Sequence, residues 1–394
     1  MSARQTLRRR VAAGFTMVEL LIAIFLSAVV LLAIYFVFIS NSQQYYRQEQ
    51  VVQMQEGMRF ALEYLKTDLR NAGRMAVSNS TDAARRDPGL CAAVRNINGL
   101  QLDDNLVGGQ VPGILGGAPN LIRPDRLTML VDASGSVPLG TRRVSGTVIE
   151  VLPSARQLTT EARASLDLQA RFDGTWREGQ YVRIHALGSD EKDLAVITAV
   201  AYNGGSPQIT LDRSTCLPTG VCDAGGCLVN PVEVVRYGLQ ADAADDTNTK
   251  TDLHRQVLDA RNRNNALDDL VIAEYAVDLQ VWATYDTRAD TAGAAPQVPY
   301  DLTPQDDKGN WPGAATEAAA MNARPERVRE LAVLLATRTP REDEALLVAL
   351  NLGNANARKA ADRVWFELDP GIEGYARVST LVARVETPNL DRGN

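Results

Sequence analysis

The chain has 394 residues, enough to bury a sizeable core, and its 45% hydrophobic and 23% charged residues are typical of a folded globular protein. Its net charge of −7 argues against nonspecific binding of nucleic acid by the whole surface. The charge is unevenly distributed. The first 14 residues contain four arginines and no acid, so the rest of the chain has 37 basic residues against 48 acidic ones and carries −11.

Near the N-terminus, the twenty residues from Leu20 to Ile39 are apolar except for Ser27. As a helix, this segment is long enough to cross a bilayer core of about 30 Å. The arginines that precede it predict that the N-terminal end stays in the cytoplasm. A signal anchor or a cleaved secretory signal is the simplest interpretation. However, the basic segment ends at Gly14, before the apolar run, and no small-residue cleavage site follows Ile39.

The carboxylate of Glu19 lies at the start of this apolar run. An ionisable side chain in a membrane segment is costly and usually has a partner. No lysine or arginine follows until Arg47, so the sequence offers this carboxylate no cationic side chain within its own helical turn. We therefore expect Glu19 to find its partner outside the apolar segment.

Residues 14–20, Gly-Phe-Thr-Met-Val-Glu-Leu, resemble the signature of type IV prepilins at all seven positions. The resemblance implies that a prepilin peptidase cuts the Gly14–Phe15 bond and methylates the new amine of Phe15. It also implies that Glu19 pairs with the terminal amine of a neighbouring subunit during assembly. Such a pair agrees with the physics, because a carboxylate in lipid gains most from a positive partner that is equally desolvated.

The helix is expected to continue beyond the membrane, because apolar residues recur three or four positions apart. This stripe consists of Val51, Met54, Met58, Leu62, Leu65 and Leu69. Asn71 and Gly73 are good terminators, and no proline occurs before Pro88. One helix from Phe15 to about Asn71 would be about 85 Å long, and we expect its second half to pack on a sheet.

After Gly73 the hydrophobic pattern changes from a period of 3.6 residues to a period of 2, which predicts a β-rich head. Strands are expected at 127–131, 147–152, 181–186, 195–201, 208–211, 232–239, 253–258, 271–285, 328–337, 364–368 and 378–385. In the 271–285 stretch, apolar residues alternate with Asp278, Gln280 and Thr284, which predicts a half-buried antiparallel strand. The predicted fold class is α+β and pilin-like, with a long N-terminal helix packed on a large, mostly antiparallel sheet.

The helix end and several stretches of the head resemble PilW-like minor pilins. These stretches are Met58–Leu62 with Asp68–Gly73, Gly179–Ile184 with Ala195–Thr198, Leu253–Arg255 ahead of Val277–Val281, and Arg327–Leu331 leading into Leu334–Thr339. The resemblance implies a minor pilin that primes pilus assembly near the filament tip, with roles in cell adhesion and twitching motility. The implied partners are other minor and major pilins, the prepilin peptidase, inner-membrane lipid and a tip adhesin.

We therefore expect three parts: a cytoplasmic leader peptide at 1–14, a long helix at 15–73 with about 15–39 in the membrane, and a periplasmic head at 74–394. The protein would cross the inner membrane once and then enter a filament at the cell surface. Two other functions stay open. The helix end is also similar to the J-type pseudopilins of type II secretion, which implies a part of a transport machine.

The other open function is a minor pilin at the filament tip that binds DNA or a host surface. DNA binding would be favoured if Arg123, Arg126, Arg142 and Arg143 converged on one face of the head. Scattered arginines would be ordinary solvated surface. We therefore predict no specific nucleic-acid partner from the sequence.

The chain has four cysteines, Cys91, Cys216, Cys222 and Cys227, which allow two disulfides with three possible pairings in an exported protein. The spacing of the last three fits no common zinc site, and no histidine lies among them. We expect one short disulfide within the 216–227 loop, which leaves Cys91 for the remaining thiol.

No catalytic role is expected for this chain. His185 and His254 lie in strand-like stretches and are interpreted as packing or surface residues rather than as ligands or bases. The acidic runs within 242–252 and 301–307 lack the central glycine and closing glutamate of an EF-hand, which favours solvated loops over calcium sites. The usual hydrolase and phosphate-loop motifs do not occur, so neither a cofactor nor a metal is expected.

Overall fold

The structure is a computed structural model. It describes residues 16–73, 98–104, 106, 124–132, 138–152, 172, 175–189, 191–203, 206–242, 250–285, 317–323, 325–340, 365–367 and 375–387. Four residues that the sequence singles out, Gly14, Phe15, Cys91 and Arg123, lie outside this set. The chain divides into two compact units, residues 1–53 and 54–394, and each unit is described by itself.

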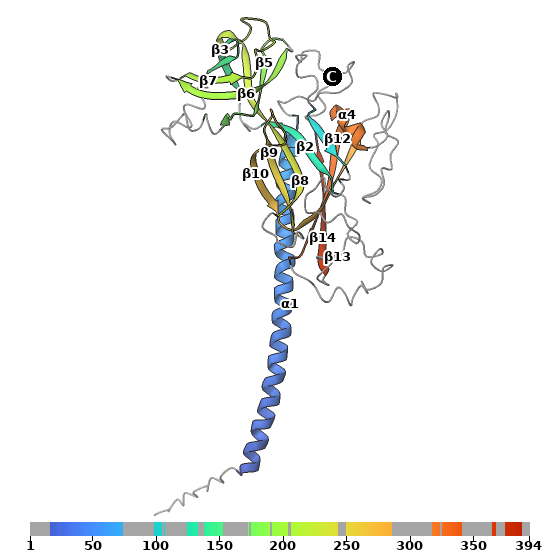
Figure 1. Cartoon of the computed structure of the whole chain (residues 1–394). Helices are drawn as coiled ribbons and strands as arrows, with labels where there is room; N and C mark the ends of the chain where they lie inside the picture. The colour runs from blue at the N-terminus through green and yellow to red at the C-terminus, as the bar shows by residue number, and fades with distance from the viewer. Residues whose placement is uncertain are drawn as a thin grey trace, which may run out of the picture. The chain divides into compact units, whose positions relative to one another are not determined.

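The first element is helix α1, Met17–Asn71, which confirms the prediction of one long helix (Figure 1). Its 55 residues contain no proline and one glycine, Gly57. The helix terminates just before Gly73, whose φ of 72° lies in the left-handed region, and the N–H of Gly73 donates to the carbonyl of Leu130 at 3.0 Å. Glycine is needed at this position because an L side chain disfavours such a backbone.

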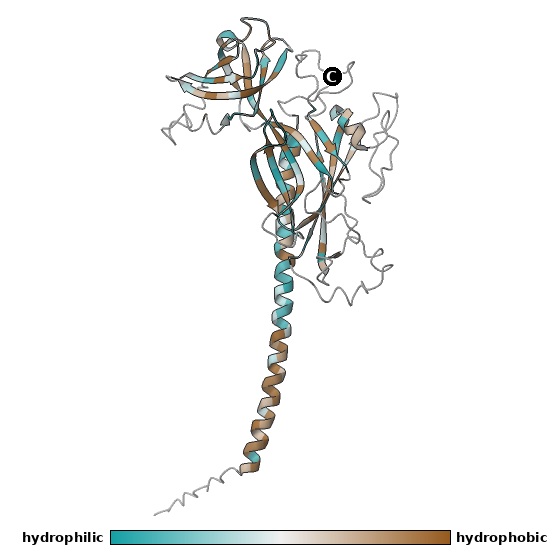
Figure 2. Ribbon diagram, viewed as in Figure 1, coloured by the Kyte–Doolittle hydropathy of each residue, from teal (hydrophilic) through white to brown (hydrophobic). Residues whose placement is uncertain are grey.

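Hydropathy changes along α1 (Figure 2). Apolar residues dominate the part between Leu20 and Phe38, and polar residues follow before the helix enters the second unit. Within the second unit, one face of α1 is buried at the three- and four-residue spacing that the sequence predicts. The buried residues are Met54, Met58, Ala61, Leu62, Leu65, Asp68 and Leu69.

The larger sheet of the head has ten strands, and all of its pairings are antiparallel. The strands are β1 (Leu100–Asp103), β2 (Arg126–Asp132), β3 (Leu139–Ser145), β4 (Val148–Leu152), β5 (Tyr181–Ala186), β6 (Lys192–Asn203), β7 (Ser206–Leu211), β8 (Cys227–Ala241), β9 (Thr251–Leu258) and β10 (Ala266–Ala273). The long strand β8 organises this sheet because it pairs with β2, β3, β5 and β9.

Six of these strands close into a ring, which the sequence did not predict. Around the ring the order is β8, β3, β4, β7, β6 and β5, and β5 pairs with β8 again. Only the first part of β8 belongs to the ring, and its second part, from Val232, pairs with β2 and β9. Inward-facing apolar side chains fill the ring, including Ile149, Trp176, Val182 and Ile197. Closure removes the free edges that an open sheet would expose.

The second sheet has the strand order β11 (Ala276–Tyr285), β12 (Val328–Arg338), β14 (Tyr375–Glu386) and β13 (Trp365–Glu367). Strand β12 is central, as the continuous apolar run Leu331–Ala336 suggests, and every residue of that run is buried. The backbone of β11 meets the first sheet at Asp125, whose N–H donates to the carbonyl of Leu279 at 2.7 Å.

The prediction of one half-buried strand over 271–285 is wrong in two respects. The chain turns at Glu274 and Tyr275, so β10 and β11 are separate strands in different sheets. Tyr275 has a φ of 55°, and its N–H donates to Asp252 at 2.9 Å. The polar face is also buried: Asp278 and Gln280 are only 6% and 3% exposed, and Gln280 donates to Asp278 at 2.9 Å.

The other predicted strands occur, with bounds that differ by a few residues at most ends. Elements that the sequence did not predict include, within the described residues, strands β1 and β3 and helix α4, Glu317–Ala323. Strand β1 has only four residues and lies in a stretch rich in Asn and Asp. Strand β3 carries Arg142 and Arg143 on its exposed side, which weakens its apolar alternation.

Candidate functional site

Glu19 lies in the first turn of α1, where it forms a reciprocal cap with Thr16. The Glu19 carboxylate accepts hydrogen bonds from the backbone N–H and the hydroxyl of Thr16, both at 2.9 Å. In return the N–H of Glu19 donates to the Thr16 hydroxyl oxygen at 3.3 Å. Thr16 is thus the N-cap and Glu19 the third helical residue, which is the geometry of a capping box.

Sequence analysis missed the role of Thr16, although the signal is present as Thr-Met-Val-Glu, a threonine followed three residues later by glutamate. The expectation that Glu19 has no cation within its helical turn is unaffected, because Thr16 supplies only neutral donors. The cap satisfies part of the hydrogen-bonding capacity of the carboxylate but leaves its charge uncompensated. A cationic partner for Glu19 therefore still has to come from elsewhere.

The apolar part of α1 is exposed on all sides. Among the described residues, α1 is the only helix that is long and apolar enough to cross a membrane. The most apolar window of this helix has no buried residue. Large side chains all around this part are more than half exposed, for example Leu20, Phe25, Leu32 and Phe38. So much exposed apolar surface indicates that lipid or other helices cover this segment in the cell. This surface is the basis for membrane anchoring.

A second polar site joins the last turns of α1 to the large sheet. One carboxylate oxygen of Asp68 accepts hydrogen bonds from the hydroxyl of Tyr237 on β8, at 2.6 Å, and from Nε of Arg255 on β9, at 2.7 Å. Tyr237 is fully buried and Asp68 is 8% exposed. Because an unpaired charge is costly at such a depth, the three groups depend on one another.

The protonation states at this site follow from its burial. Burial and the adjacent charge of Asp68 raise the pKa of Tyr237, so its hydroxyl stays protonated and donates. Burial pulls the pKa of Arg255 down, but the hydrogen bond and charge of Asp68 outweigh this effect and the net shift is upward. With Arg255 kept charged and Tyr237 kept neutral, the site is an ion pair with one neutral donor, suited to holding α1 against the sheet.

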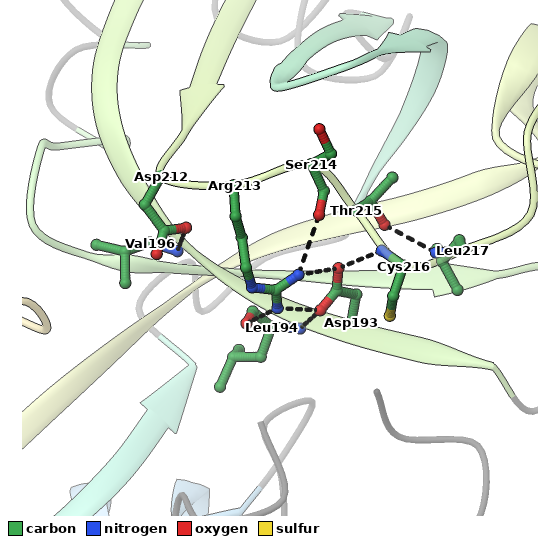
Figure 3. A network of polar contacts seen from close by, with 9 residues as sticks. All are labelled: Asp193, Leu194, Val196, Asp212, Arg213, Ser214, Thr215, Cys216 and Leu217. Atoms are coloured by element: carbon green, nitrogen blue, oxygen red, sulfur yellow. Dashed lines mark hydrogen bonds and ion pairs between the residues drawn. The ribbon is translucent and has the colours of Figure 1, made fainter. Parts of the chain in front are cut away.

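The loop between β7 and β8 is fixed by a third network, centred on the fully buried Asp193 (Figure 3). Arg213 forms a two-pronged ion pair with this carboxylate, with Nη2–Oδ1 at 2.5 Å and Nη1–Oδ2 at 3.0 Å. The backbone N–H groups of Leu194 and Cys216 donate to it at 2.8 and 3.1 Å. The hydrogen bonds that Arg213 donates to Asp193 raise the pKa of Arg213, so its guanidinium stays charged.

A disulfide joins Cys222 and Cys227 in the same loop. Both sulfur-bearing residues are buried, and the hydroxyl of Thr141 on β3 hydrogen-bonds to the Cys222 carbonyl. Cys216 is also disulfide-bonded, and Cys91 lies outside the described residues. The bond and the Asp193 network together tie this loop to the closed ring.

Of the four predicted arginines, the three in the described residues, Arg126, Arg142 and Arg143, do not lie together on one face. Arg126 on β2 forms an ion pair with Asp103 at 2.9 Å and lies over Gly238 of β8. Arg142 and Arg143 follow the part of β3 that pairs with Val229 and Leu228, at the other end of β8. Nine residues of β8 separate Val229 from Gly238, which corresponds to about 30 Å.

The two histidines lie in strands β5 and β9. Nδ1 of His254 is 2.6 Å from Asp269 on β10. In the first acidic run, Asp242 and Asp252 both pair with Lys250, at 2.8 and 3.3 Å. Among the described residues, no group of histidine, cysteine, aspartate or glutamate side chains could hold a metal ion. The second acidic run, 301–307, lies outside those residues.

One comparison with known proteins gave a match, and it lies in the N-terminal segment. Residues 9–35 match the family model described as the prokaryotic N-terminal methylation motif. Neither the curated proteins nor the solved structures contained a match. The match spans the capped start of α1 and most of its exposed apolar part. Residues 9–35 thus carry the N-terminal methylation motif of type IV prepilin-like proteins, and proteins with this motif are structural and associate in general with other pilins and with prepilin peptidase.

Proposed function

We propose that the chain is a minor type IV pilin, PilW-like, that helps to prime pilus assembly and sits near the filament tip. The observation that carries this proposal is the exposed apolar first part of α1, which coincides with the methylation motif. Its first turn contains Glu19, capped by Thr16. The PilW-like resemblance of the head stretches supports the minor-pilin subtype and the place near the tip.

In this proposal, prepilin peptidase cuts between Gly14 and Phe15 and methylates the new amine of Phe15. The four arginines before the cut keep the leader in the cytoplasm, so the head lies on the periplasmic side of the inner membrane. The mature chain waits in the membrane as a single-span subunit and then enters the filament by helix–helix packing.

Glu19 selects the position at which a neighbour docks. A charged side chain in the bilayer costs about 2.5–3.5 kcal/mol on insertion scales. Thr16 provides neutral hydrogen bonds, whereas the methylated amine of a neighbouring subunit provides a positive charge. The free energy gained on assembly is the difference between the Glu19 carboxylate paired with this amine and the same carboxylate capped by Thr16. This gain requires the two helices to be in register.

The test is Glu19→Ala in the full chain, with Glu19→Gln as the matched variant. Both variants are expected to insert, to be cleaved and to fold their heads, because the head does not depend on Glu19. Both should co-purify poorly with partner pilins and support few pili, because neither carries the charge. Wild-type co-purification and piliation in both variants would show that Glu19 has no role in assembly and would overturn the mechanism.

The J-type resemblance of the helix end keeps a second candidate, a minor pseudopilin of a type II secretion system. Deletion of the gene separates the two, because loss of pili with normal secretion supports the minor pilin. Loss of secretion with normal piliation supports the pseudopilin and contradicts the first proposal.

A further inference from the structure

Exposed apolar side chains lie on both sides of the Asp68–Arg255 ion pair, one set on helix α1 and one on strand β10. On the helix, Tyr64 lies one turn before Asp68, and Phe60 lies one turn before Tyr64. The exposed fraction rises along this row from 8% at Asp68 to 40% at Tyr64 and 56% at Phe60. The rings of Phe60 and Tyr64 contact each other with centroids 5.0 Å apart.

A matching row crosses the sheet. Leu127, Tyr237, Arg255 and Leu270 are directly opposite one another on β2, β8, β9 and β10. Opposed residues of antiparallel strands point to the same face, and Tyr237 and Arg255 mark this as the face on which Asp68 lies. Leu127 and Tyr237 are fully buried, whereas Leu270 is 44% exposed. The helix therefore covers the middle of the sheet and leaves β10 uncovered.

Strand β10 is a sheet edge within the described part of the chain, since its only described pairing is with β9. Native edge strands are normally blunted by charge or by a covering element. Here Leu270 is 44% exposed on the face that carries Asp68, although it follows directly after Asp268 and Asp269, whereas Val271 points to the opposite face. An exposed apolar side chain at the sheet edge, on the same face as a helix with an exposed aromatic pair, indicates a contact surface.

Gly57 extends the helix side of this surface. It lies three residues before Phe60, and a Cβ added to it would meet no atom within 4 Å. Glycine inside a helix costs about 1 kcal/mol relative to alanine, so its own packing does not explain its presence. An open glycine beside a large side chain allows a second helix to approach closely.

We propose that Gly57, Phe60, Tyr64 and Leu270 form a docking surface, here called the α1–β10 surface, for the helix of a different pilin-like subunit. This inference rests on the proposed function, because the methylation motif supplies the partner class and a shared membrane places the partner helix alongside α1. Arg59 and Glu63 flank Phe60 with opposite charges, which fits a helix of mixed charge rather than a polyanion. The −11 charge beyond residue 14 disfavours a second copy of this chain.

The test is photocrosslinking in cells that express the full chain and its pilus system. The crosslinking residue p-benzoylphenylalanine replaces Tyr64 in one variant and Leu270 in another. The matched control is Val382 of β14, an apolar strand residue that is similarly exposed, at 39%. We expect Tyr64 and Leu270 to crosslink to a pilin-like subunit of different sequence, identified by mass spectrometry, and Val382 to give no such product.

Crosslinks only to a second copy, only to lipid or to nothing would overturn the proposal, and so would equal crosslinking at Val382. A second arm uses Leu270→Asp, with Val382→Asp as control. Only the first should lower partner co-purification, by about tenfold, the scale of one lost hot-spot contact. Both should keep the wild-type melting temperature because both sites are exposed.

The Glu19 variants separate failure of the surface from failure of the function. If Glu19→Ala loses the partner while Leu270→Asp keeps it, the α1–β10 surface is wrong and the proposed function stands. If no pilin-like subunit co-purifies even with the wild-type chain, the proposed function itself fails.

Discussion

The two parts of helix α1 bury their apolar residues in opposite ways. From Met17 to Phe38, apolar side chains surround the helix and are exposed on every side. From Met54 to Leu69, apolar side chains follow one stripe and are buried. The second part is completed by this chain's own head, whereas the first part has to be completed by lipid or by other subunits.

The polar residues differ in the same sense. Asp68 is paired by Tyr237 and Arg255 of its own head, so its charge is compensated within the monomer. Among the residues that the structure describes, Glu19 is held by the neutral donors of Thr16. The comparison predicts that changes near Glu19 alter processing and assembly but not folding, and that changes near Asp68 alter folding first.

The largest effect is expected at the predicted cleavage site. Gly14→Val should leave the leader attached, because the side chain added next to the scissile bond blocks a peptidase site that is expected to require glycine. Mass spectrometry of the membrane fraction should find the unprocessed chain alone. The melting temperature of the detergent-solubilised head should match that of the wild type, and a head that unfolds in this variant would break the comparison.

The next effect concerns the site that joins α1 to the sheet. Asp68→Ala leaves the buried Tyr237 hydroxyl and Arg255 guanidinium without their shared acceptor, which costs about 3–5 kcal/mol for a broken buried pair. Denaturant unfolding of the full chain in detergent measures this loss. Glu63→Ala, one to two turns earlier on the exposed side, is the control and should change little. Equal stability of the two variants would show that Asp68 does not hold α1 to the head.

A smaller effect is expected from the short disulfide. Replacing Cys222 and Cys227 by serine opens a loop of only a few residues, so the expected loss is about 2 kcal/mol on the chain-entropy scale. Non-reducing peptide mapping of the wild type should recover the Cys222–Cys227 bond, and by elimination it should pair Cys91 with Cys216. Four free thiols in protein taken from the cell envelope would contradict this prediction.

The smallest effect is a pH dependence at Asp259, next to the β9–β10 turn. Hydrogen bonds from Arg261, including Nη2–Oδ2 at 2.9 Å, lower the pKa of the Asp259 carboxyl. A lowered folded-state pKa means that Asp259 stabilises the fold above the ordinary carboxyl pKa of about 3.9 and that this contribution disappears as the pH falls below it. Asp259→Asn should therefore be slightly less stable at pH 7, and the difference from wild type should shrink towards pH 2. A constant difference over this range would exclude the charge as its cause.

Much of the fold could be predicted because its signals are local. The helix shows a 3.6-residue period and has a glycine terminator at Gly73, and the strand at 181–186 shows its bounds directly in the sequence. The break between β10 and β11 could not be read in the same way, because Tyr275 adopts a positive φ without being glycine or asparagine. Asp252 of β9, 23 positions earlier, holds that turn through a hydrogen bond that no local pattern specifies.

In the candidate site, too, residues in local patterns could be predicted from the sequence, and residues joined by tertiary packing could not. Glu19 could be identified from its place in an apolar run, and the Thr16 cap was available from the threonine–glutamate spacing. The Asp68–Tyr237–Arg255 site could not be, because its three residues are up to 187 positions apart and only tertiary packing joins them. Closure of the six-stranded ring likewise depends on strand partners that no local pattern specifies.

The proposed maturation as a type IV pilin is best tested at the N-terminus of the mature wild-type protein. The protein is isolated from the membrane or filament fraction, and its first peptide is sequenced by mass spectrometry. We expect a chain that begins at Phe15, with a mass increase of one methyl group on its amine. A mature chain that begins at any other residue, or one that begins at Phe15 without methylation, would contradict it.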